Sequence, residues 1–115
     1  MDVSKILVWN VRGLNQRARR DSVREEVNST RPDIICLQET KLEHVTLRHT
    51  LSALGSDYDK FISLPANGTC GGGVLIAWKS TVCQCISTRI DTFTASVQFV
   101  AEDGPSWWFM GVYGP

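Results

Sequence analysis

"DIICLQET", residues 33–40, places an unbroken run of apolar side chains directly before a short polar segment. The run 34–37 consists of Ile, Ile, Cys and Leu, and such a run is typical of a strand that is buried on both faces. Glu39 stands just beyond the end of that strand. Two interpretations are open here: Glu39 is an ordinary loop or helix N-cap residue, or its carboxylate holds a metal ion.

A second short apolar run, "KILVWNV" at 5–11, precedes this one and also predicts a strand. Residues 17–28 lie between the two runs and show a helical pattern, in which Ala18, Val23 and Val27 share one side. Two such strands separated by a helix of this length form a βαβ unit with parallel strands. The first third of the chain therefore predicts an α/β arrangement.

A second helix is expected over residues 43–55, with Leu47, Leu51 and Leu54 on one side and Gly55 at its end. From residue 58 onward, short β-rich runs alternate with turn sequences. These runs are "YDKFISLP", "GGGVLIAWK", "TVCQCISTRI", "TFTASVQFVAE" and "SWWFMGVYGP". The sequence thus predicts a single α/β (α+β) domain, βαβα followed by antiparallel strands.

Composition limits the classes of function. Twelve basic residues balance twelve acidic residues among 115, so no global attraction to nucleic acid or membrane is indicated. Arg17, Arg19, Arg20 and Arg24 form a local cluster, which is either a solvated helix face or a nucleic-acid contact. No signal peptide, membrane span or CxxC pair is evident. We therefore expect an intracellular protein with reduced thiols and no membrane partner.

Three polar residues follow predicted strands. Asn10 and Glu39 end the two parallel strands, so both side chains should lie at the same edge of the sheet, where α/β proteins bind ligands. A carboxylate oxygen with an amide oxygen is a ligand set suited to Mg²⁺ or Mn²⁺. Tyr113 ends the last β-rich run, and its phenol could hydrogen-bond to a phosphate oxygen or simply face water.

Glycines and tryptophans have simpler interpretations. Gly71, Gly72 and Gly73 precede a strand rather than a helix, which excludes a P-loop and favours a turn with close backbone approach. The tryptophans of the β-rich half are interpreted as packing residues, with base stacking as the alternative. These are Trp78, Trp107 and Trp108.

The order of "VWNVRGLN", "RPDIICLQETKL", "GGGVLIAW" and "GVYGP" resembles the endonuclease/exonuclease/phosphatase superfamily, which contains DNase I-like and exonuclease III-like phosphodiesterases. Within this superfamily, these motifs are most similar to those of the endonuclease domain of plant LINE-type non-LTR retrotransposons. The resemblance implies a four-layer αββα two-sheet sandwich, of which residues 1–115 would form the N-terminal half. It assigns metal binding to Glu39, organisation of the metal and scissile phosphate to Asn10, and phosphate contact to Tyr113.

The function implied is Mg²⁺-dependent hydrolysis of a DNA phosphodiester, in the nucleus. Lys41 and Arg17 are further candidates for nucleic-acid contact. The family's later motifs, a D-x-N element and an Asp-His pair, have no counterpart here, so we expect a truncated domain with negligible activity of its own. Its uncovered sheet edge would favour self-association. A non-enzymatic nucleic-acid-binding or relic product, and a phosphatase of the same superfamily, remain open alternatives.

Overall fold

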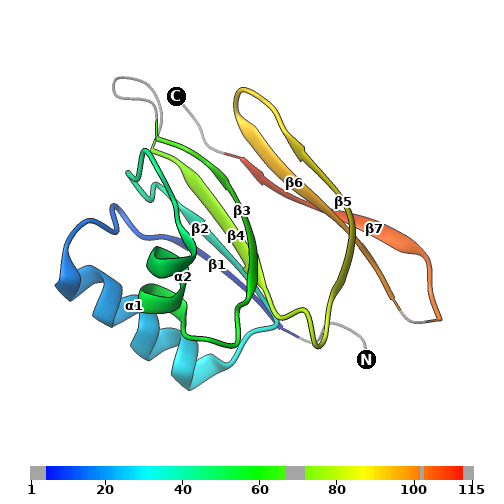
Figure 1. The fold of residues 1–115 in the computed structure, drawn as a ribbon, viewed down its shortest axis with the longest axis horizontal. Coiled ribbons are helices and arrows are strands. Elements are labelled where there is room, and N and C mark those ends of the chain that lie inside the picture. The colour runs from blue at the N-terminus through cyan, green and yellow to red at the C-terminus, as the bar shows by residue number, and fades with distance from the viewer. Residues whose placement is uncertain (1–4, 67–71, 102, 113–115) are drawn as a thin grey trace.

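A computed structural model describes residues 5–66, 72–101 and 103–112. Figure 1 shows three layers: two helices, a four-stranded sheet and a three-stranded sheet. The four-stranded sheet lies in the middle, with the helices on one face and the other sheet on the opposite face. The predicted mixed α/β fold with two sheets is confirmed.

The first sheet has the order β1-β2-β4-β3. Its strands are β1 (Ile6–Asn10), β2 (Ile34–Gln38), β3 (Lys60–Leu64) and β4 (Val74–Trp78). β1 pairs parallel with β2, as the βαβ pattern predicts, and β4 runs antiparallel to both β2 and β3. The two central strands, β2 and β4, are buried on both faces, which explains why both are continuous apolar runs.

Helix α1 (Arg17–Thr30) connects β1 to β2 and packs on the first sheet through Val23 and Val27. The prediction that Ala18 shares this buried side is wrong, because Ala18 lies in the exposed first turn of the helix. The helix ends at Arg31, which adopts a left-handed conformation with φ 49°. Neither helix in the described part of the chain is long and apolar enough to cross a membrane.

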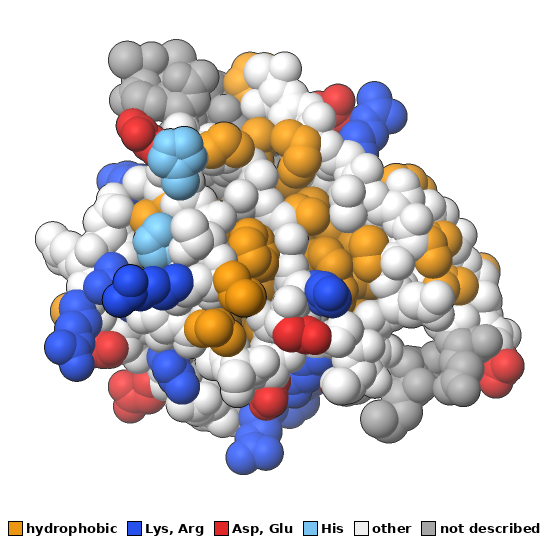
Figure 2. All heavy atoms as spheres, in the orientation of Figure 1, with side chains coloured by type: hydrophobic (Ala, Val, Ile, Leu, Met, Phe, Trp, Pro, Cys, Tyr) orange, Lys and Arg blue, Asp and Glu red, His pale blue; other side chains and the backbone are white. Residues whose placement is uncertain are grey.

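Helix α2 (Leu47–Leu54) is shorter than predicted. Thr46 caps it, accepting a hydrogen bond from the His49 backbone while His49 Nδ1 accepts one from the Thr46 backbone. The predicted apolar side is wrong for Leu47 and Leu51, which are 51% and 38% exposed. In the view of Figure 2, hydrophobic side chains lie exposed across the middle of the molecule. The side of α2 that is buried consists of Thr50, Ala53 and Leu54.

The second sheet is an antiparallel meander with the order β5-β6-β7. Its strands are β5 (Gln84–Ile90), β6 (Thr94–Val100) and β7 (Ser106–Val112). A register shift between Cys85 and Ser87 interrupts the pairing of β5, whereas β6 and β7 pair without interruption. The prediction of antiparallel strands in this half is confirmed.

Two hydrophobic cores lie on opposite faces of the first sheet. Along β2, Ile35 and Leu37 pack toward the helices, while Ile34 and Cys36 pack toward the second sheet. Burial raises the pKa of the Cys36 thiol to about 11, so this residue serves as a neutral core side chain. Gly111 lets the sheets approach closely, because a Cβ there would lie 2.8 Å from Val74 Cγ1.

The second sheet leaves part of the first sheet uncovered. β7 contacts β2 and β4, and on neighbouring β1 the side chains of Ile6 and Val8 are 44% and 54% exposed. β7 is itself an edge strand, paired only with β6, and its Trp108 and Met110 are 49% and 56% exposed. Trp108, interpreted as a packing residue, is therefore half exposed, and an uncovered strand edge is present among the described residues, as expected.

Candidate active site at the carboxyl ends of β1 and β2

The parallel register of β1 and β2 sets Asn10 opposite Gln38, so that Glu39 follows at the same edge of the sheet. Beyond the strands the backbones stay paired: Val11 N donates to Gln38 O at 2.9 Å and Gly13 N donates to Glu39 O at 2.7 Å. Two loops, 11–14 and 39–41, therefore run side by side. The prediction that Asn10 and Glu39 end up at one edge is confirmed.

The backbone of these two loops is strained. Among the described residues, four non-glycine residues have positive φ, and three of them lie here: Arg12 (53°), Glu39 (55°) and Lys41 (56°). The fourth is Arg31, the C-cap of α1. Such conformations cost about 1–3 kcal/mol each and cluster at functional sites. The strain singles out this edge of the sheet.

The start of β4 supports the glutamate loop from the other side. The backbone N–H of Lys41 donates to Gly72 O, and that of Thr40 donates to Gly73 O. A Cβ on Gly72 would lie 2.9 Å from both Cα and Cγ of Glu39, and one on Gly73 would lie 2.6 Å from Thr40 Oγ1. The predicted close backbone approach is thus confirmed at these two glycines, while Gly71 lies outside the described residues.

Two hard oxygen donors are available at this edge. The half-buried Glu39 supplies a carboxylate, and Asn10 supplies a carboxamide oxygen that already accepts a hydrogen bond from Arg12 N at 3.2 Å. That oxygen retains a second lone pair. No group of three or more His, Cys, Asp or Glu able to hold a metal is found among the described residues. The donor set fits Mg²⁺, which keeps several waters and binds through one or two protein oxygens plus substrate phosphate.

The end of β7 reaches the same edge. Gln38 Nε2 donates to the backbone oxygen of Val112 at 3.2 Å, which joins the two sheets beside the candidate site. Tyr113, the third predicted site residue, lies outside the described residues. Sequence reasoning missed the role of Gln38, because the contact joins residues 74 positions apart and no local pattern signals it.

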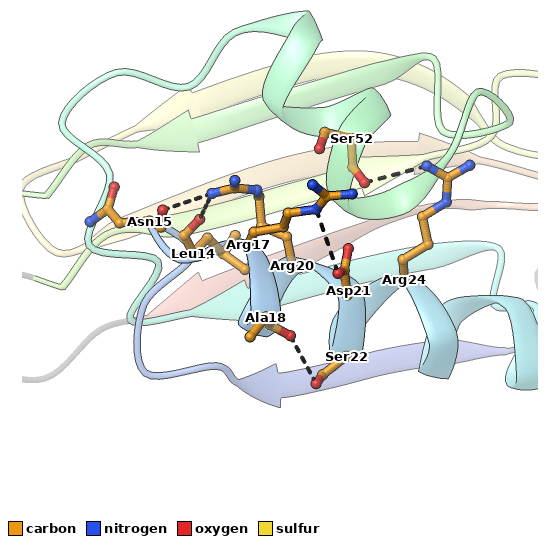
Figure 3. A network of polar contacts seen from close by, with 9 residues as sticks. All are labelled: Leu14, Asn15, Arg17, Ala18, Arg20, Asp21, Ser22, Arg24 and Ser52. Atoms are coloured by element: carbon orange, nitrogen blue, oxygen red, sulfur yellow. Dashed lines mark hydrogen bonds and ion pairs between the residues drawn. The ribbon is translucent and has the colours of Figure 1, made fainter.

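The two candidate nucleic-acid contacts differ in their surroundings. Lys41 lies on the glutamate loop and is exposed. Arg17 lies in the first turn of α1 and forms an exposed ion pair with Asp21, at 3.9 Å. The structure thus places Lys41 next to Glu39, whereas Arg17 points its charge toward its own helix (Figure 3).

Arg19 and Arg20 contact the loop that follows β1, whereas Arg24 donates to backbone oxygens of α2. Arg19 donates to Val11 O, and Arg20 donates to the backbone oxygens of Leu14 and Asn15, each at 2.8 Å. Figure 3 shows Arg20 reaching back along α1 to this loop. The helix face is therefore neither simply solvated nor simply a free basic surface, since these guanidinium groups hold the Asn10 loop in place.

The sequence that forms this two-sheet fold and its candidate site also matches a known family. The sequence model of the Endonuclease/Exonuclease/phosphatase family matches residues 7–109. The chain belongs to this family. The predicted superfamily is thereby confirmed, and the residues matched include both Asn10 and Glu39.

Two curated relatives of this endonuclease/exonuclease/phosphatase chain are AP endonucleases. It is 36% identical over 77 residues to the DNA-(apurinic or apyrimidinic site) endonuclease 2 of Xenopus laevis, covering 67% of this chain and 14% of that protein. It is 35% identical over 75 residues to the DNA-(apurinic or apyrimidinic site) endonuclease of Dictyostelium discoideum, covering 65% and 20%. The chain thus spans a small part of either relative.

Solved structures show the same fold. The AP endonuclease of Leishmania major superposes with a TM-score of 0.66 at 21% identity, over 97% of this chain and 40% of that one. The catalytic domain of Xenopus laevis APE2 also gives 0.66, at 23% identity, over 96% and 45%. This endonuclease/exonuclease/phosphatase chain spans less than half the length of either structure.

Proposed function

We propose that the chain is part of a metal-dependent phosphodiesterase that cleaves DNA. The observation that carries this proposal is the juxtaposition of Glu39 and Asn10 on two strained, hydrogen-bonded loops at the carboxyl ends of parallel strands. The family and the AP endonuclease relatives support DNA as the partner. A phosphatase of the same superfamily would use the same edge, but no relative reported above favours it.

The metal we propose is Mg²⁺, or Mn²⁺, held by the Glu39 carboxylate and the Asn10 carboxamide oxygen. Such an ion, when bound, stabilises negative charge on the phosphoryl oxygens. The chain's own contribution is to fix the donors: Gly72 packs against Glu39, and the Arg12 backbone N–H orients the Asn10 side chain. Tyr113 is proposed to donate a hydrogen bond to the phosphate.

The proposed reaction is hydrolysis. A water oxygen forms a bond to phosphorus, the bond from phosphorus to the departing sugar oxygen breaks, and that oxygen takes up a proton. The family resemblance assigns activation of the water and the partner histidine to later motifs with no counterpart in these 115 residues. Loss of a general base costs about 10²–10⁴-fold in rate, so we expect the 115-residue chain alone to be almost inactive.

More specifically, we propose that the complete protein is an endonuclease of the LINE-type retrotransposon class that acts in the nucleus. The sequences "WNVRGLN" and "QETKL" support it. We also propose that residues 1–115 correspond to the N-terminal half of a complete domain, in keeping with the 40% and 45% of solved chains that they cover. An endonuclease of this type should cut an intact duplex as readily as one carrying an abasic analogue, whereas an AP endonuclease requires the abasic position.

Plasmid nicking with Mg²⁺ tests the proposal. The purified chain is compared with Glu39→Ala and with the matched control Glu43→Ala, which removes an exposed carboxylate four residues away. Weak nicking that disappears in Glu39→Ala and persists in Glu43→Ala supports a metal-dependent nuclease. Nicking that survives Glu39→Ala contradicts it. If no variant nicks, including at high protein concentration, Mn²⁺ binding by Glu39 becomes the deciding measurement.

A second candidate function is DNA binding without cleavage. It is favoured by one observation: Arg12 and Lys41 are exposed beside Glu39, and no hydrogen bond or ion pair engages their charged groups within the described ranges. Salt-dependent DNA binding by a chain that neither nicks nor binds Mn²⁺ would favour this function over the nuclease.

A further inference from the structure

Arg12 and Lys41 lie close together although 29 positions separate them in the sequence. Their loops are joined by hydrogen bonds from Gly13 N to Glu39 O and from Leu14 N to Thr40 O, at 2.7 and 2.9 Å. A Cβ on Gly13 would lie 3.5 Å from Lys41 Cδ, so the stem of the lysine crosses over the residue next to Arg12. The backbone positions of Arg12 and Lys41 therefore lie close together at the edge of the sheet.

The charges of this pair are available to a ligand. Both residues are exposed, and the polar contacts found for them in the described ranges use their backbone atoms. The arginines of α1 differ, because Arg19 and Arg20 donate to backbone carbonyls and Arg17 pairs with Asp21. Since the whole chain carries no net charge, two unengaged cations at one edge are a local feature rather than part of a general basic surface.

Backbone strain is a second, independent observation. Arg12 and Lys41 have φ values of 53° and 56°, a conformation that glycine or asparagine adopts at far lower cost. A turn alone would not require long cationic side chains at these positions. Residues held in this region of conformational space cluster at ligand-binding sites, where the strain fixes the direction of a functional group.

We propose that Arg12 and Lys41 together bind one phosphate of the DNA backbone, adjacent to the phosphate addressed through Glu39. The planar guanidinium suits bidentate contact with two phosphate oxygens, and the ammonium adds a point charge. The inference rests on the proposed function only in naming DNA as the source of the phosphate. The pair would position the strand so that the neighbouring phosphodiester meets Glu39 and Asn10.

Salt-dependent binding of a fluorescein-labelled 20-base-pair duplex, in EDTA, tests the pair without any need for metal or cleavage. The variants are Arg12→Gln, Lys41→Gln and the double variant. Arg31→Gln is the matched control, because Arg31 is also an exposed arginine with positive φ (49°) but precedes β2 at its opposite end. The fold of each variant is checked by thermal unfolding.

We expect the slope of log affinity against log salt concentration to become less negative in each single variant and by about 0.9 in the double variant, because the pair neutralises one phosphate. Arg12→Lys should keep the slope, and Arg31→Gln should leave it unchanged. An unchanged slope in Arg12→Gln, an equal change in Arg31→Gln, or no binding by the wild type overturns the proposal. In EDTA, Glu39→Ala should bind the duplex at least as tightly as the wild type. Loss of nicking in that variant would then reflect loss of the metal ligand and not weaker binding of DNA.

Discussion

The side chain of Gln38 donates a hydrogen bond to the backbone oxygen of Val112 at 3.2 Å, and this contact ties the last residue of β2 to the last residue of β7. It joins the two sheets at the edge that carries both Glu39 and Asn10. The end of β7 is thereby fixed to the strand that carries the candidate metal ligand. The geometry of the site thus depends on both sheets rather than on the βαβ unit alone.

Replacement of Gln38 by Ala should loosen the end of β7. We expect faster amide hydrogen exchange over residues 109–112 and a loss of about 0.5–1.5 kcal/mol in the free energy of unfolding, since one hydrogen bond is removed. Gln98→Ala is the control, because Gln98 Nε2 bonds to Ser106 Oγ at the opposite end of β7. Equal exchange rates at 109–112 in Gln38→Ala and wild type would show that this contact does not hold the strand.

The distance between the sheets depends on Gly111. A Cβ at this position would meet Val74 Cγ1 at 2.8 Å and Cys36 Sγ at 3.2 Å, so Gly111→Ala should lower the free energy of unfolding by about 1–3 kcal/mol through overpacking. Val74→Ala removes the first of these contacts. In that background Gly111→Ala should cost less than half as much, which urea denaturation of the four variants measures. The same cost in both backgrounds would contradict the overpacking account.

Strain at Glu39 predicts a conflict between stability and binding. Glu39→Gly relieves a positive φ of 55° and should raise the free energy of unfolding by about 1 kcal/mol while removing the candidate metal ligand. Arg31→Gly, at the left-handed C-cap of α1, should give a similar gain with no effect on metal binding. Destabilisation by Glu39→Gly would mean that the carboxylate makes stabilising contacts that outweigh the strain.

Metal binding can be measured without catalysis. Titration of Mn²⁺, followed by electron paramagnetic resonance of the free ion, should show binding to the wild type that Glu39→Gln abolishes and Asn10→Ala weakens. The larger effect belongs to Glu39 because it supplies the anionic oxygen. Glu43→Gln is the control. Equal Mn²⁺ affinity in Glu39→Gln and wild type would place the metal elsewhere on the chain.

Burial, together with the charges of Asp57 and Asp33, raises the pKa of Tyr58 to about 12. The unfolded chain releases this proton near pH 10, its ordinary value, so the stability that depends on the protonated phenol is complete below pH 10 and declines as pH rises toward 12. Tyr58 Oη also donates to Pro32 O at 2.5 Å. Absorbance titration at high pH should show a late-ionising tyrosine that Tyr58→Phe removes.

Tyr58→Phe should also cost about 1–3 kcal/mol at neutral pH, because the buried Pro32 carbonyl loses its donor. The gap in unfolding free energy between wild type and variant should then narrow above pH 10, as the wild type alone loses stability from this phenol. Urea denaturation at neutral pH and at two alkaline values provides the measurement. A gap that stays constant would show that Tyr58 ionises alike in the folded and unfolded chains.

Local patterns predicted the strands and the shared edge well, because β2 and β4 are continuous apolar runs and parallel neighbours necessarily end at the same edge. The same reasoning failed for α2. Three leucines predicted its apolar side, but the helix instead buries its smaller Thr50 and Ala53 together with Leu54. Small side chains permit close packing with α1 and the sheet, and that requirement depends on tertiary structure rather than on periodicity.

The site was predictable only as far as sequence neighbours define it. Asn10 and Glu39 follow directly from the ends of two strands. The strain at Arg12 and Lys41, the approach of Gly72 and the contact of Gln38 with β7 arise where distant segments meet. Such long-range contacts leave no periodic or local signal in the sequence.

The edge strand β7 and the uncovered part of β1 affect how rapidly the protein is degraded in a cell. Edge strands without charges or proline are surfaces on which other unpaired chains dock, and β7, "SWWFMGV", has neither. Molecular chaperones and degradation enzymes act on chains with such apolar exposure, so we expect the cellular abundance of these 115 residues to be governed by turnover rather than by synthesis. A solubility-enhancing charge on the outer face of β7, such as Met110→Lys, should lengthen the half-life of the chain without touching the residues at the opposite face of that strand.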